Sequence, residues 1–96
     1  FQDPVGGKEK HGKRAREDTW DKGFQPGHSW NCELVFMSVN VDQVAVHLIN
    51  HGNIDGNTFD LESIEIYWIG DCGRIVRCHT YFNPTEDMNL DPYWTV

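Results

Sequence analysis

From residue 30 to residue 82 the chain repeats with a period of two, so that apolar side chains alternate with others along four stretches. Successive side chains of a strand point to opposite faces of a sheet, and this repeat therefore predicts strands. The predicted strands are residues 30–39, 43–51, 59–69 and 74–82. Residues 55–56 (Asp-Gly) and 70–73 (Gly-Asp-Cys-Gly) are typical of tight turns, since these residue types tolerate positive φ. The pattern predicts a four-stranded antiparallel meander.

One helix is predicted ahead of these strands. Residues 13–22 favour helix formation, and Gly23 is a natural stop. Only Ala15 and Trp20 give this helix an apolar side. A helix with so narrow an apolar side has to lie across the sheet to be stable. Residues 3–12, which come before it, are polar and predict a loop.

The size and composition of the chain limit its class. Residues 1–96 are enough for one α+β domain, in which residues 83–96 are predicted to be an irregular tail. The net charge of −7 repels a phosphate backbone, which argues against a nucleic-acid partner. No apolar run approaches the ~20 residues that cross a bilayer, which argues against a membrane partner.

The cysteines and histidines give no metal or disulfide pattern. The 3 cysteines are an odd number and lack metal-site spacing, which favours a reducing cytoplasm as the compartment. His47 and His51 are on one predicted strand, about 13 Å apart, and so cannot share one metal ion. We therefore expect a protein without a bound cofactor.

The third predicted strand places Glu65 among apolar side chains. Its face is shared by Phe59, Leu61, Ser63, Tyr67 and Ile69. Apolar neighbours disfavour the charged form of a carboxyl, so one hypothesis is that Glu65 is protonated near neutral pH and can donate a hydrogen bond. The other is a buried acid paired with a Lys or Arg.

The opposite face of the same sheet is apolar as well. A sheet with two apolar faces has to be covered on both, and the chain has few helical residues to do so. We therefore expect a homodimer in which two outer faces pack together about a two-fold axis. The predicted contact residues are Ile49, Ile64, Ile66, Trp68 and Tyr81.

Two blocks of sequence stand out by their order and separation. The first is residues 3–6 (Asp-Pro-Val-Gly), followed by a short helix that carries Trp20. The second runs from residues 63–67 (Ser-Ile-Glu-Ile-Tyr) through the turn at 70–73 to residues 80–82 (Thr-Tyr-Phe). Together they resemble the ketosteroid isomerase and polyketide cyclase branch of the superfamily that includes nuclear transport factor two and scytalone dehydratase.

This resemblance implies a cone-shaped fold, in which helices wrap a curved antiparallel sheet around an interior pocket. In that family leading helices precede the Asp-Pro-Val-Gly loop, so we expect about 30 to 40 further residues of helical pattern before Phe1. The family's general base falls on Asp3, and its protonated oxyanion donor falls on Glu65. The implied reaction is cofactor-independent proton abstraction from carbon next to a carbonyl.

The implied ligand is a small apolar or ring-containing molecule held inside the cone. Its predicted contacts are Trp20, Val46, Leu48, Asn50, Leu61, Ser63, Tyr67, Cys78, Thr80 and Phe82. The chain departs from the family where Glu65 replaces an aspartate, Trp20 a tyrosine, and Asn50 an apolar side chain. Two functions stay open: an enzyme of the isomerase, cyclase or hydrolase kind, and a non-catalytic dimeric module of the same fold that binds ligands or partners. For Asp3, the alternative to a catalytic base is an Asx turn.

Overall fold

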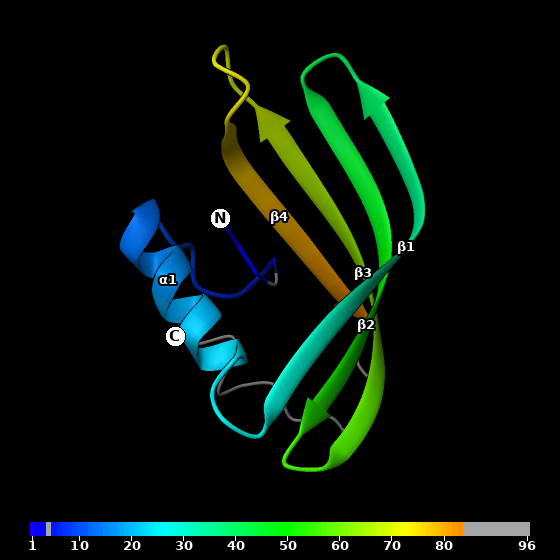
Figure 1. The fold of residues 1–96 in the computed structure, drawn as a ribbon. Coiled ribbons are helices and arrows are strands. Elements are labelled where there is room, and N and C mark those ends of the chain that lie inside the picture. Colours follow the sequence, from blue (N-terminus) through cyan, green and yellow to red (C-terminus); the bar gives the residue numbers. More distant parts are fainter. Residues whose placement is uncertain (4, 84–96) are drawn as a thin grey trace.

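A single helix precedes four strands in the computed structural model, which describes residues 1–3 and 5–83 (Figure 1). The elements are α1 (Gly12–Gly23), β1 (His28–Asn40), β2 (Gln43–Ile54), β3 (Asn57–Ile69) and β4 (Ile75–Asn83). All neighbouring strands are antiparallel, and their order in the sheet is β1-β2-β3-β4. The predicted α+β class and the four-stranded meander are confirmed. The predicted tail, apart from Asn83, lies outside the described residues.

The sheet is curved, and α1 lies on one side of it together with the N-terminal segment (Figure 1). No helix among residues 1–3 and 5–83 is long and apolar enough to cross a membrane. The chain that precedes α1 is partly paired with the sheet. Gln2 N donates to Cys78 O at 2.9 Å, and Thr80 N donates to Gln2 O at 2.9 Å. These bonds add Gln2 to the edge of β4 and direct the residues that follow it over the sheet.

The turns set the register of the hairpins. Asp55 and Gly56 have φ of 52° and 88°, and they join β2 to β3 as a two-residue hairpin turn. Because this turn is so short, β2 extends to Ile54 and β3 begins at Asn57, beyond the predicted ends. Between β1 and β2 the chain turns at residues 41–42, where Val41 has a φ of 56°. Positive φ is rare for a β-branched residue.

A bulge interrupts the alternation along β1. The pairing with β2 shifts between Leu34 and Phe36, which leaves Val35 without a partner across the strands. A bulge moves the residues beyond it to the opposite face, so Met37 faces the same way as Leu34. The sequence pattern alone did not predict this change of face.

Only one hydrophobic side chain among the described residues is buried completely, and this is Leu61. The buried polar residues beside it on the inner face of the sheet are Asn50, Ser63 and Thr80. The inner face, which is the face that carries Leu61, therefore has a polar centre. Because these three polar side chains are buried, each of them needs a hydrogen-bond partner.

The outer face of the sheet is partly exposed. Ile64 is 50% exposed and Tyr81 is 44% exposed, while Ile49, Ile66 and Trp68 are half-buried. Trp68 packs edge-on against the His79 ring at 5.0 Å between ring centroids, so part of this face is covered by its own side chains. The association of two such faces stays a prediction.

Candidate active site

A pocket of about 440 Å³ lies between the inner face of the sheet, α1 and the N-terminal segment. That volume suits a small ligand. The sheet contributes Trp30, Cys32, Asn50, Glu65, Tyr67, Cys78, Thr80 and Phe82. The helix and the chain on either side of it contribute Phe1, Asp3, Arg16, Thr19, Trp20, Gly23 and Phe24. The two predicted catalytic residues, Asp3 and Glu65, therefore line the same pocket.

The predicted ligand contacts divide into two groups. Those that line the pocket are Trp20, Asn50, Tyr67, Cys78, Thr80 and Phe82. The others, Val46, Leu48, Leu61 and Ser63, share the inner face but do not line the pocket. Leu61 and Ser63 are 0% and 1% exposed, and the Asn50 amide donates to the backbone oxygen of Leu61 and to Ser63 Oγ.

Asp3 lies in the wall of the pocket. The edge pairing of Gln2 with β4 brings the following carboxyl over the sheet. Asp3 Oδ1 is buried and has no hydrogen-bond partner among the described residues. Burial, and then the charge of Glu65, raise the pKa of Asp3 to about 6, while Lys10 opposes the shift. Asp3 therefore stays mostly ionised at neutral pH although its carboxyl is buried.

The Asx turn that was the alternative for Asp3 lacks its usual donor. In such a turn, the side chain accepts a hydrogen bond from the amide two residues later. That amide is Val5 N, and it donates to Thr80 O at 2.8 Å instead. The backbone here is held by β4, and the carboxyl is left without that local role.

Glu65 and Tyr67 form a pair within β3. They are two residues apart on the same face, and the Tyr67 hydroxyl donates to Glu65 Oε2. Burial, followed by the hydrogen bond to Glu65, holds the pKa of Tyr67 above its usual range, so the hydroxyl keeps its proton. The alternative partner for Glu65, a Lys or Arg, is not found among the ion pairs of the described residues.

Neither pocket cysteine is a nucleophile at neutral pH. Burial raises the pKa of the Cys78 thiol to about 11 and also raises the pKa of Cys32. A thiolate, and not a thiol, attacks an electrophile or binds a metal. No group of three or more His, Cys, Asp or Glu residues in the described part of the chain could hold a metal ion. Hydrolysis through a cysteine nucleophile is therefore disfavoured in this pocket.

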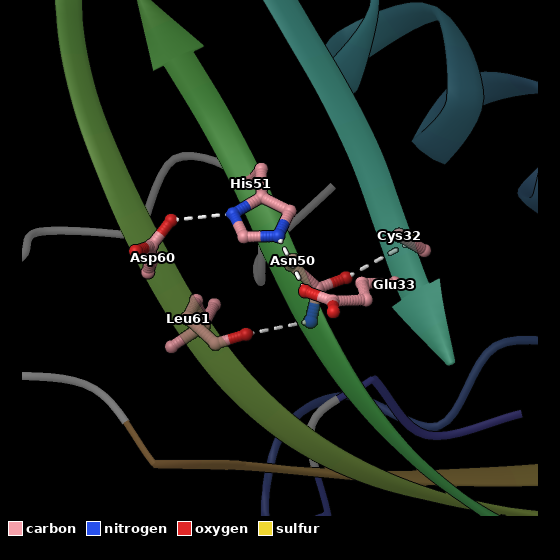
Figure 2. A network of polar contacts seen from close by, with 6 residues as sticks. All are labelled: Cys32, Glu33, Asn50, His51, Asp60 and Leu61. Carbon is pink, nitrogen blue, oxygen red and sulfur yellow. Dashed lines mark hydrogen bonds and ion pairs between the residues drawn. The ribbon is translucent and has the colours of Figure 1, made fainter. Parts of the chain in front are cut away.

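Asn50 orders the centre of the pocket wall. Its amide nitrogen donates to Leu61 O at 2.9 Å, and its oxygen accepts from the Cys32 thiol at 3.2 Å (Figure 2). The same nitrogen donates to Ser63 Oγ at 2.9 Å. These bonds occupy both amide protons, so Asn50 has no proton left for a ligand. Its role in the pocket wall is to hold β1, β2 and β3 in register.

His51, the next residue along β2, lies on the opposite, outer face of the sheet. His51 bridges two acids: its Nε2 lies 3.0 Å from Glu33 Oε2, and its Nδ1 lies 2.6 Å from Asp60 Oδ1 (Figure 2). The hydrogen bond with Glu33, then that with Asp60, raise the pKa of His51. This group lies on the outer face, away from the pocket.

Sequence reasoning missed several pocket residues for two reasons. Arg16, Thr19 and Gly23 recur at helical spacing on the side of α1 that also carries Trp20, a signal present in the sequence. Trp30 and Cys32 are opposite Gly52 and Asn50, so extending the face assignment to β1 would have found them. The stack of Phe24 on Trp20, at 4.3 Å between centroids, depends on how the chain leaves the helix.

Comparison of the chain with protein-family models, with curated proteins and with solved structures gave no match. A function for this pocket therefore has to be argued from its own geometry and chemistry.

Proposed function

We propose that the protein binds a small ring-containing ketone in this pocket and moves a proton at the carbon next to the carbonyl. The observation that carries the proposal is that Asp3, from the N-terminal segment, and Glu65, from β3, line one pocket. A base and an oxyanion donor have to face the same small volume for this reaction.

Asp3 has the properties of the base. A pKa of about 6 leaves it mostly ionised at neutral pH and also makes it a stronger base than an ordinary aspartate. Its unpartnered Oδ1 keeps a lone pair that no described hydrogen bond occupies. In the proposed step this oxygen takes the proton from carbon, and the electron pair of the C–H bond moves to the carbonyl oxygen as an enolate.

Glu65 would hold the enolate oxygen, with Tyr67 behind it. A protonated Glu65 would donate through one oxygen, while its Oε2 accepts from the Tyr67 hydroxyl. Such a chain of donors polarises each bond in turn and stabilises the charge that develops on the oxygen. Asp3 then returns the proton to carbon, either at the same atom or further along the conjugated system.

The cone-shaped fold and a homodimer belong to the same proposal. The curved sheet with α1 and the pocket on its inner side supports a cone (Figure 1). The half-exposed Ile64 and Tyr81 support association through the outer face, together with Ile49, Ile66 and Trp68. Symmetric packing of two such faces would cover apolar surface that α1 does not reach.

A binding module without catalysis is the second candidate. The observation that favours it is the direction of the bond between Tyr67 and Glu65, in which Glu65 accepts. An ionised Glu65 would accept hydrogen bonds from a ligand but would donate none. The pocket would then bind a molecule that carries hydroxyl groups and would leave its carbon–hydrogen bonds intact.

Proton exchange at carbon separates these two functions. We expect the protein to catalyse exchange of the α-protons of 2-tetralone in D₂O, followed by NMR. Asp3→Asn should abolish this exchange and still bind 2-naphthol, a planar mimic of the enolate. Binding of 2-naphthol should be weakened less by Glu65→Gln, which keeps a donor, than by Glu65→Leu. If the wild-type protein binds 2-naphthol but exchanges no protons, the non-catalytic module is the better description.

A further inference from the structure

The pocket has charges of opposite sign on different elements. Asp3 comes from the N-terminal segment and Glu65 from β3, whereas Arg16 lines the pocket from α1. Arg16 is exposed and takes part in no ion pair among the described residues. Lys13, one turn earlier on the helix, is paired with Glu17 at 3.5 Å. Arg16 is thus a pocket cation whose charge no described acid neutralises.

The pocket is lined from two sides. Glu65 comes from β3 in the sheet, and Arg16 comes from α1, the helix that lies over the inner face of that sheet (Figure 1). Trp20 and Phe24, stacked at 4.3 Å between ring centroids, belong to the pocket wall on the same side as Arg16. The lining thus combines an acidic end, an aromatic wall and a cationic group.

A ligand that matches this lining has three parts in the same order. The carbonyl would face Asp3 and Glu65, the ring system would lie on the aromatic wall, and an anionic group would face Arg16. Guanidinium binds a carboxylate through two parallel hydrogen bonds, which also fixes the direction of the ligand. The net charge of −7 and the ionised Asp3 would otherwise repel an anion, so Arg16 is the group that would admit it.

We infer that Arg16 makes the pocket selective for ring-containing keto acids, in which a carboxylate lies at the end of the ring system opposite to the carbonyl. This inference rests on the proposed function, because it assigns the substrate class of the same pocket. Arg16 is a specificity residue in this scheme, and the proton transfer remains with Asp3.

Two probes that differ only in the carboxylate test the inference. They are 2-naphthol and 6-hydroxy-2-naphthoate, and their Kd values are measured by fluorescence titration at constant ionic strength. We expect the wild-type protein to bind the carboxylate probe about fivefold more tightly, the scale of one partly exposed ion pair. Arg16→Gln should remove this advantage, so that the variant binds the two probes with Kd values that agree within about twofold.

The matched control is Arg14→Gln, which removes the same charge from α1 at a residue that does not line the pocket. This variant should keep the fivefold advantage. If Arg14→Gln and Arg16→Gln weakened the preference for the carboxylate probe equally, the preference would be a general effect of charge, and the inference would be overturned. Equal affinity of the wild-type protein for both probes would also overturn it, while leaving the proposed function in place. Failure of both probes to bind would overturn the inference together with the proposed function.

Discussion

At the scale of single residues, the buried carboxyl of Asp3 makes the stability of the protein depend on pH. The pKa of Asp3 is raised from 3.8 to about 6 on folding, so the folded state holds the proton more tightly than the unfolded state. The free energy of unfolding therefore falls as the pH rises between these two values, and the loss is complete above the folded pKa. At neutral pH the ionised Asp3 destabilises the fold, as expected where function needs a desolvated charge.

Asp3→Asn should therefore stabilise the protein at pH 7.5, by on the order of 3 kcal/mol if the side chain keeps its place. The gain should shrink as the pH is lowered and vanish at about pH 3, where the carboxyl is protonated in both states. Urea unfolding at pH 7.5 and at about pH 3 measures this dependence on pH. Asp71→Asn removes one charge from an exposed turn and serves as the control. A gain that does not change with pH would show that burial of the charge is not its cause.

The same carboxyl sets the pH dependence of proton exchange. The rate of α-proton exchange should rise about tenfold per pH unit below pH 6 and level off above it, because only the ionised Asp3 accepts a proton. NMR exchange rates between pH 4.5 and pH 8 give this profile. A flat profile would argue that another group is the base.

At the scale of elements, the turn between β1 and β2 carries strain at Val41. Its φ of 56° is in the left-handed region, and its side chain is fully exposed. A left-handed conformation costs an ordinary residue about 1–2 kcal/mol, and no packing here offsets that cost. Val41→Gly should therefore raise the free energy of unfolding by roughly 1 kcal/mol, after the greater flexibility of glycine in the unfolded chain is counted.

Gly56 offers the opposite change in the next turn. It has a φ of 88°, and a Cβ added there would meet no atom within 4 Å. Gly56→Ala should therefore lower stability by about 1 kcal/mol through backbone strain alone. Urea unfolding compares both variants with the wild-type protein. If neither Val41→Gly nor Gly56→Ala changed the free energy of unfolding, positive φ at these two residues would not affect stability.

The hairpins also contain a pH-dependent bridge at His51, which joins β1, β2 and β3 through Glu33 and Asp60 (Figure 2). The pKa of His51 is raised in the folded state, so His51 adds to the free energy of unfolding below its unfolded pKa of about 6.5. This stabilisation is lost as the pH rises through the folded pKa. His51→Gln should therefore cost more stability at pH 5.5 than at pH 9 in urea unfolding. An equal cost at both values would contradict a charged bridge.

At the scale of the whole molecule, the outer face decides the state of association. We expect a homodimer at micromolar concentration, since Ile64 and Tyr81 are left half-exposed beside Trp68. Trp68→Glu should give monomers or insoluble protein in light scattering, because it puts two acids at the proposed two-fold contact. Ile75→Glu makes a similar change on the inner face, opposite Ile69, and should leave the dimer intact. A soluble wild-type monomer would contradict this prediction.

The sequence by itself determined the strands and part of the site. Alternation along β3 is a local property of the backbone, so it placed Glu65 and Tyr67 on one face without knowledge of the fold. The turn at residues 55–56 was equally local, because its residue types alone permit positive φ. Both features follow from covalent geometry over a few residues.

Only the tertiary structure decided what each face meets. The bulge at Val35 changes the facing residues of β1, and the pairing of Gln2 with β4 carries Asp3 from a loop into the pocket wall. Neither the bulge nor this pairing is set by residues that are neighbours in the sequence. Burial, charge and hydrogen bonding are set by segments that are distant along the chain, and these segments give Asp3 its raised pKa and leave Arg16 unpaired among the described residues.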